Sequence, residues 1–126
     1  MTLPAQLLLS EFVLDGEQAV VIEQRAIARK WFSAFQAIDL AMREPWTQLG
    51  PQSRVTGPAA VKLAETSVVA ELAVRFTVTE GTIKTYAHTA RVLVERLPGV
   101  WERFAEGFVH EQNASEAARL VQELPG

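Results

Sequence analysis

A long amphipathic pattern runs through residues 17–44, EQAVVIEQRAIARKWFSAFQAIDLAMRE. Apolar residues recur there at three- and four-residue steps, with charged residues largely between them, which is typical of an α-helix with one buried face; they are Val20, Ile27, Trp31, Ala34, Ile38 and Met42. Asp15 is a candidate N-cap, and Pro45 marks the end because the residue before a proline disfavours the α region. The pattern predicts one helix from Glu17 to Glu44.

This helix would be on the order of 40 Å long at about 1.5 Å per residue. A compact chain of 126 residues does not need such a rod, so we expect a packing partner along it and predict a homo-oligomer. Trp31, Phe32 and Phe35 cannot all lie on one narrow stripe of the helix. Either they are enclosed within the chain or part of the cluster contacts a partner, and the sequence leaves both open.

Prolines and glycines separate this helix from the rest of the chain. Residues 45–57 hold two of each, which predicts a linker loop, and Pro58 suits the first turn of the next helix. Four further helices are expected at 58–76, 80–97, 100–106 and 113–124, the first of them with a break near Thr66 and Ser67.

Caps and breakers define the ends of these helices. The β-branched residues from Thr77 to Thr79 resist helix continuation, and Thr79 is the candidate N-cap of the helix that follows. Gly107 is expected to close the short helix after Pro98. Asn113, with Glu116 three positions later, is the candidate cap of the last helix.

The predicted fold is therefore an all-α helical bundle in a single domain, residues 1–126. It divides into an N-terminal helical arm (1–44), a linker loop (45–57) and a helix-turn-helix-like bundle (58–126). No segment shows sustained period-two alternation, although residues 68–78 are rich enough in valine to raise the question of a strand.

Composition excludes several classes of function. With no cysteine, the chain has no disulfide, thiolate metal site or cysteine nucleophile, and a reducing compartment is expected. The N-terminus lacks a basic region and no apolar run reaches the ~18–20 residues of a membrane span, so we expect a cytoplasmic protein without a membrane partner. A net charge of −3 argues against a general polyanion binder, so any contact with DNA must be local.

Residues 71–86, ELAVRFTVTEGTIKTY, resemble a helix-turn-helix of the kind found in sigma-factor region four and in response-regulator output domains. Those families place a small residue in the first helix, here Ala73. They begin the recognition helix with a hydroxyl residue followed by Glu-Gly-Thr-Val/Ile-Lys, here Thr79 to Lys84. The turn departs from their pattern, because Thr77 occupies the position usually given to glycine, which adopts positive φ freely.

The helix after this turn has two chemically different sides when it is projected at about 100° per residue. One side is expected in the core and carries Ile83, Tyr86, Ala87, Ala90, Val94 and Leu97. The other carries Lys84, His88, Arg91 and Glu95, with Thr85 beside them and Thr79 and Thr82 at the N-terminal tip.

A recognition helix offers its N-terminal residues to base edges and its cations to phosphates. We therefore expect double-stranded DNA as a partner and predict its contacts at Thr79, Thr82, Lys84, Thr85, His88 and Arg91. The same mixture of residues also fits a solvent-exposed helix face or a subunit contact, and the sequence leaves that alternative open.

A wider resemblance reaches the end of the chain. It rests on the runs AELA (70–73), ARVLVERLP (90–98), FAEGFV (104–109) and Ala114 to Leu120. These runs, with Leu97-Pro98 and Gly107 at matching spacing, resemble the actinobacterial thirteen-E-twelve repeat family. Glu111 or Gln112 stands near the place where that family usually has serine.

The resemblance implies a helical domain of unassigned function that commonly precedes an HNH endonuclease domain. The predicted function is accordingly a non-catalytic, DNA-associated domain, the N-terminal part of an HNH-endonuclease-type protein. The alternative is a protein-interaction or dimerisation module that does not contact DNA.

We expect no catalytic, metal or cofactor site in these residues and no small-molecule substrate. His88 and His110 are the only histidines, and their spacing matches no ligand motif. Glu102 and Glu106 share a helix face, but we expect this acidic region to be exposed to solvent and therefore do not expect an acid-base site there. The sequence Asn113-Ala114-Ser115 formally matches a glycosylation acceptor, and we interpret it as part of a helix cap.

Overall fold

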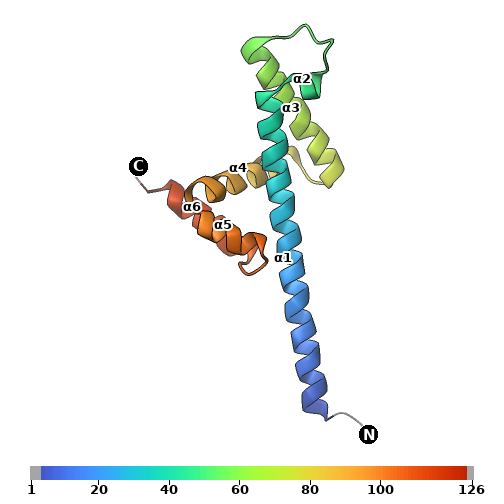
Figure 1. The fold of residues 1–126 in the computed structure, drawn as a ribbon, viewed down its shortest axis with the longest axis vertical. Helices are drawn as coiled ribbons and strands as arrows, with labels where there is room; N and C mark the ends of the chain where they lie inside the picture. Colours follow the sequence, from blue (N-terminus) through green and yellow to red (C-terminus); the bar gives the residue numbers. More distant parts are fainter. Residues whose placement is uncertain (1–3, 125–126) are drawn as a thin grey trace.

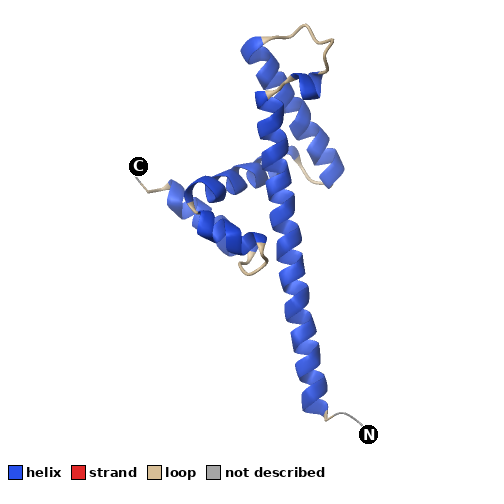
Figure 2. Ribbon diagram, viewed as in Figure 1, coloured by secondary structure: helices blue, strands red, loops and turns tan. Residues whose placement is uncertain are grey.

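The structure is a computed structural model that describes residues 4–124. In these residues it contains six α-helices and no strand (Figure 2). The predicted all-α fold with one long N-terminal helix is therefore confirmed. The valine-rich stretch that raised the question of a strand is helical as far as Phe76.

The first helix, α1 (Ala5–Arg43), ends where the sequence predicts but begins much earlier. The backbone N–H of Glu44 donates to the carbonyl of Leu40 at 2.8 Å, and Pro45 follows. The predicted start is wrong, because Asp15 lies inside the helix and does not cap it. Leucines and other good helix formers precede Gly16, whose cost inside a helix is only about 1 kcal/mol.

The two halves of α1 have different surroundings. Every residue from Ala5 to Val20 is exposed, and Figure 1 shows this half projecting beyond the other helices; we call it the protruding segment. The packed segment, Val21 to Arg43, lies against the rest of the chain. Its buried residues recur at helical spacing and are Gln24, Ala28, Trp31, Ala34 and Ala41.

The predicted linker loop is partly helical. Within it, α2 (Trp46–Leu49) forms one turn that packs on α3 (Gly57–Phe76). There the amide Nε2 of Gln48 donates to the hydroxyl of Ser67 at 2.9 Å. The predicted break in α3 near this serine is wrong, because a serine inside a helix is tolerated when its hydroxyl bonds elsewhere and does not compete for the backbone.

The last three helices are α4 (Glu80–Arg96), α5 (Pro98–Ala105) and α6 (Glu111–Gln122). The predicted cap of α6 is wrong. Asn113 lies inside the helix and His110 is the N-cap, with its Nδ1 accepting from the N–H of Gln112 at 3.1 Å. The N–H of Glu111 donates to Oε1 of the buried Gln24 at 2.8 Å. Gln24 thus joins the start of α6 to α1, from 87 residues away.

Gly107 connects α5 to the packed segment, as a closing glycine with positive φ (94°). A Cβ at this position would overlap the carbonyl oxygen of Val21 and lie 2.7 Å from its Cγ1. The backbone of the loop after α5 therefore touches α1 at the point where the packed segment begins.

Two clusters of buried side chains hold the helices together, and α4 contributes to both. One lies between α1, α3 and α4 and includes Ile83 and Ala87; the other joins α1, α4, α5 and α6 around Leu93 and Phe104. Figure 1 shows α4 crossing α1 between the two groups of helices. This central position fixes the orientation of α4, whose exposed side carries the predicted DNA contacts.

The aromatic cluster of α1 divides between core and surface. Trp31 is buried, with its ring stacked on Tyr86 at 5.8 Å between centroids and against the edge of Phe104 at 4.9 Å. Phe32 stacks on Trp101 at 5.6 Å but remains 37% exposed. Intramolecular packing therefore covers Trp31 fully and Phe32 only in part.

Candidate nucleic-acid interface

The turn between α3 and α4 has a left-handed residue at its corner. Thr77 has φ 60° and ψ 45° and is the one non-glycine residue with positive φ in residues 4–124. Its N–H donates to the carbonyl of Val74 at 3.3 Å, and the N–H of Val78 donates to that of Ala73 at 3.0 Å. This pair of bonds is the Schellman motif. Thr77 therefore takes the conformation for which the resembling families use glycine.

The same motif closes α5 with glycine at the equivalent position. There the N–H of Gly107 donates to the carbonyl of Phe104 at 3.0 Å, and the N–H of Phe108 to that of Arg103 at 2.9 Å. The two helix ends differ in the residue that takes positive φ. A β-branched residue in this region costs roughly 1–2 kcal/mol, so the corner at Thr77 is formed against local preference.

Thr79 caps α4 as predicted and shares its hydroxyl with the first turn. Its Oγ1 accepts from the N–H of Thr82 at 3.1 Å and lies 2.8 Å from the Oγ1 of Thr82. One turn later, the hydroxyl of Thr85 donates to the carbonyl of Gly81 at 3.0 Å. A hydroxyl has one donor and two acceptor positions, so each of the three can bond a further partner. Thr79 and Thr85 are exposed, and Thr82 is half-buried.

The two sides of α4 are arranged largely as the helical projection predicts. Ile83, Ala87 and Ala90 are buried, and Tyr86, Val94 and Leu97 are half-buried. A further side, which the projection missed, is also buried because α5 and α6 cover it; it carries Thr89, Val92 and Leu93. The side predicted to be polar is exposed: Lys84, Thr85, His88, Arg91 and Glu95.

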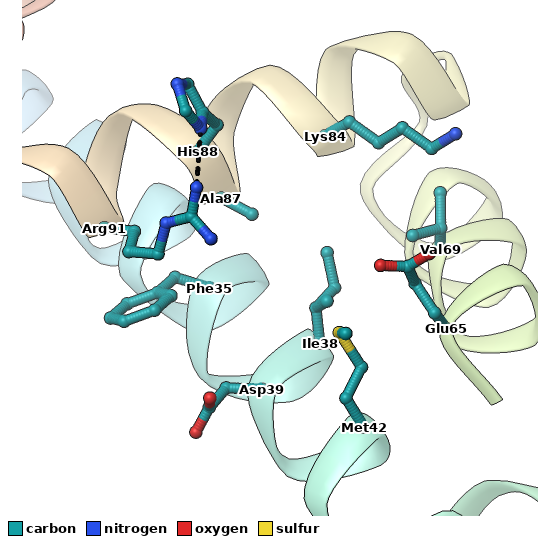
Figure 3. A pocket seen from close by; sticks show the side chains of 10 residues that line it. All are labelled: Phe35, Ile38, Asp39, Met42, Glu65, Val69, Lys84, Ala87, His88 and Arg91. Carbon is teal, nitrogen blue, oxygen red and sulfur yellow. Dashed lines mark hydrogen bonds between the residues drawn. The ribbon is translucent and has the colours of Figure 1, made fainter. Parts of the chain in front are cut away.

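Three of the predicted residues, Lys84, His88 and Arg91, line a groove of about 300 Å³ between α4, α1 and α3 (Figure 3). The groove also has apolar residues, which are Phe35, Ile38, Met42, Val69 and Ala87. Asp39 of α1 and Glu65 of α3 complete its lining. Thr79, Thr82 and Thr85 do not line it and lie at the N-terminal end of α4.

The cations of the groove lack ion-pair partners, whereas its acids have them. Asp39 accepts from Nε of Arg43 at 2.8 Å, and Glu65 accepts from Nζ of Lys62 at 3.2 Å. Within the part of the chain that the structure describes, no carboxylate lies within 4.0 Å of Lys84 or Arg91. Two uncompensated positive charges therefore stand on the exposed side of α4.

His88 is held by two neighbours. Arg91 lies 3.1 Å from its Nδ1, and the amide of Gln122 in α6 contacts its Nε2. Because a guanidinium only donates, Nδ1 accepts the hydrogen bond from Arg91. The contact from Gln122 to Nε2 is made by its amide nitrogen. His88 thus orients Arg91 and ties α4 to α6.

Charged residues of α6 form ion pairs with neighbours close in sequence. Arg119 bonds the carboxylate of Glu116 and donates to that of Glu123 at 2.8 Å. The hydrogen bond from Arg119 lowers the pKa of Glu116, against an opposing desolvation and with a further contribution from the charge of Arg119. These residues are exposed, so the pairs are of the surface kind, which contribute little to stability.

Within residues 4–124, no three His, Asp or Glu side chains gather closely enough to bind a metal ion. In the same residues, no helix combines the length and apolarity that crossing a membrane requires. No protein-family model, curated protein or solved structure matches this chain.

Proposed function

We propose that this chain is a non-catalytic, DNA-associated helical domain that contacts duplex DNA with the exposed side of α4. The observation that supports the proposal is the corner at Thr77 and the cap at Thr79, after which α4 exposes Lys84 and Arg91 without ion-pair partners among residues 4–124. The positive end of the helix dipole lies at the same tip.

The predicted residues have distinct roles in this proposal. Lys84 and Arg91 neutralise phosphates, and His88 holds the guanidinium of Arg91 in place. The hydroxyls of Thr79, Thr82 and Thr85 bond base edges or phosphate oxygens. The chain is acidic as a whole, with a net charge of −3, so we expect weak binding that depends on local contacts and falls with salt.

The resemblance to the thirteen-E-twelve repeat family extends the proposal to the natural context of the domain. A nuclease of the HNH type would be carried by a separate domain, which this one positions on DNA. The lack of cysteine fits a reducing compartment, and we propose that the protein acts in the cytoplasm.

A charge reversal tests the DNA proposal. The double variant Lys84→Glu/Arg91→Glu should lose about ten-fold or more of its affinity for a duplex in a low-salt mobility-shift assay, because two phosphate contacts become repulsive. The matched control is Arg54→Glu/Arg103→Glu, two exposed cations outside α4. Both pairs reverse two positive charges and so change the net charge equally.

The comparison between the two variants decides the outcome. Loss of binding in the α4 variant alone supports the proposed interface. Equal affinities for all three proteins, or equal losses in both variants, would remove α4 as the contact surface. Far-ultraviolet circular dichroism of each variant establishes that the helices remain folded.

A second candidate function is a protein-interaction module, and the protruding segment favours it. This half of α1 exposes Leu7, Leu9, Phe12, Val13 and Leu14 by between 52% and 70%. A helix that is apolar on all sides is normally buried, and exposed apolar patches of this kind mark contact surfaces. The two functions are compatible because they use different helices.

A further inference from the structure

The charged residues of α1 up to Lys30 are separated by sign. Glu11, Asp15 and Glu17 lie in the protruding segment, and no Lys or Arg occurs between residues 4 and 24. Arg25, Arg29 and Lys30 follow in the packed segment, and no Asp or Glu occurs between residues 24 and 38. One helix thus carries an acidic stretch directly followed by a basic one.

Four of these charges share one line along the helix. At about 100° per residue, Glu11 and Arg29 fall at the same angle, and Asp15 and Arg25 lie within about 40° of them. All four are exposed, and none has an ion-pair partner within 4.0 Å among residues 4–124. The line continues at three- and four-residue steps through exposed apolar or amide side chains, namely Leu7, Leu14, Gln18, Ile22 and Phe32. We call these nine residues the outer stripe.

Most of the outer stripe faces away from the core of the bundle, and its last residues, Arg29 and Phe32, lie beside α5. The buried residues of the packed segment centre on the opposite side of α1, around Gln24, Trp31 and Ala34. A second helix can therefore approach the stripe from the side of α1 opposite these buried residues. The stripe spans residues 7–32, nearly four heptads, and sustained helix pairing needs about three to four.

We propose that the outer stripe pairs with the outer stripe of a second copy of this chain, in antiparallel orientation, with Glu11 opposite Arg29 and Asp15 opposite Arg25. Asp15 lies four residues after Glu11, and Arg25 lies four residues before Arg29. A single antiparallel alignment therefore brings both pairs together. Its two-fold axis falls at Val20, where the protruding segment meets the packed one. Two-fold symmetry repeats each pair, giving four ion pairs.

The orientation follows from charge. A parallel pair in register would place Glu11 against Glu11 and Arg29 against Arg29, and like charges in such positions are repulsive. The antiparallel alignment replaces each repulsion with an attraction. It also lays the acidic protruding segment of each copy along the basic stretch of the other, so each copy covers the stripe side of its partner's protruding segment.

A groove on the packed segment lies where the partner's end would reach. Ala28, Arg29, Phe32 and Ser33 of α1 and Trp101 and Ala105 of α5 line a cavity of about 360 Å³. In the proposed alignment, residues 7 and 8 of one copy lie opposite residues 33 and 32 of the other. Leu7 and Leu8, which are 52% and 37% exposed, would enter this groove and cover the exposed part of Phe32.

The chemistry of the segment disfavours a lipid surface as the occupant. Helices that lie on membranes carry Lys and Arg on their polar side, which anionic lipids attract. The protruding segment has acids only. The negative charge of the protruding segment is complementary to the basic stretch that contains Arg25, Arg29 and Lys30. A second copy of the chain supplies such a basic stretch.

The proposal rests on the second candidate function, and a charge swap tests it on the full chain. Glu11→Arg/Asp15→Arg and Arg25→Glu/Arg29→Glu should each weaken self-association about a hundred-fold or more, because every attractive pair becomes repulsive. An equimolar mixture of the two variants should recover the wild-type dimer as a heterodimer. Sedimentation equilibrium or light scattering measures all three samples.

Each outcome has one meaning. A wild-type chain that stays monomeric at about 100 μM overturns both self-association and the pairing. A dimer that survives the charge reversals, or a mixture that fails to associate, overturns the pairing but leaves self-association standing. Loss in both variants with recovery in the mixture supports the proposal. None of these outcomes bears on the DNA contact of α4.

Cross-linking tests the orientation, since the chain contains no cysteine. The variant Leu7→Cys/Ser33→Cys should form an oxidised covalent dimer. Leu7→Cys alone should not, because the antiparallel pair holds the two Leu7 positions about 40 Å apart. Cross-linking of the single variant as efficiently as the double one would indicate a parallel pair and overturn the proposed alignment.

Discussion

The two halves of α1 are built from similar residues, yet only one is covered. The packed segment contacts all five other helices, whereas the protruding segment exposes every residue. Both contain leucine, isoleucine, valine or phenylalanine at helical spacing. An amphipathic pattern therefore shows which residues require a partner and does not show whether the same chain supplies it.

The contrast has a thermodynamic consequence. An isolated helix of 16 residues, the length of the protruding segment, is marginal in water because nucleation is costly and no packing repays it. Continuity with the packed segment helps to keep it helical. Matched substitutions in the two halves should therefore differ in their effect on the free energy of unfolding. Tryptophan fluorescence reports the bundle alone, since all three tryptophans lie beyond residue 20.

The largest difference in the free energy of unfolding is expected between alanine substitutions of two phenylalanines, one in the bundle and one in the protruding segment. Phe104 is fully buried and Phe12 is 70% exposed. Phe104→Ala should lower the free energy of unfolding by about 3–5 kcal/mol through lost burial and an internal cavity. Phe12→Ala should change it by less than about 0.5 kcal/mol when the chain is diluted to a monomer. Urea titration measures both, and equal costs would show that the protruding segment is covered within one chain.

Alanine substitutions of two glycines should give the next largest difference in stability, and the two effects should have opposite signs. Gly107→Ala should cost about 2–4 kcal/mol, from the left-handed backbone and the overlap with Val21. Gly16→Ala meets no atom within 4 Å and should instead stabilise the protruding segment by about 0.5–1 kcal/mol. Thermal unfolding followed by circular dichroism compares them. A destabilising Gly16→Ala would mean that another element approaches α1 there.

The smallest contrast is between two glutamines. Gln24→Ala removes the acceptor for the N–H of Glu111 and should cost about 1–3 kcal/mol, because a buried donor loses its partner. Gln18→Ala, on the exposed half, should stay within about 0.5 kcal/mol of the wild type when the chain is diluted to a monomer. Hydrogen exchange at the start of α6 provides a local readout. Unchanged protection in Gln24→Ala would contradict the role of this side chain in capping α6.

Much of the fold could be predicted from local signals. The end of α1 before Pro45, the cap at Thr79 and the closing role of Gly107 each depend on a few adjacent residues. The errors have equally specific causes. Leucines before Gly16 extend α1 beyond the expected start, and His110 caps α6 where a better-known capping residue, Asn113, stood nearby.

The candidate site was only partly visible in the sequence. The projection of α4 separated its exposed cations from its apolar side, because both lie within one helix. It did not show that Lys84, His88 and Arg91 share a groove with Asp39 and Glu65. It also missed Gln122, which contacts His88 from α6. These neighbours come from other helices, and no local pattern identifies them.

Sequence alone was sufficient to predict an all-helical chain and to separate the polar and apolar sides of α4, because hydrogen bonds and side-chain neighbours within a helix lie at most four residues apart. Tertiary structure alone decided where α1 is covered, since Gly107 and Glu111 reach Val21 and Gln24 from the far end of the chain. It also decided that Thr77 accepts a left-handed conformation, because packing of α3 and α4 outweighs the local preference of a threonine.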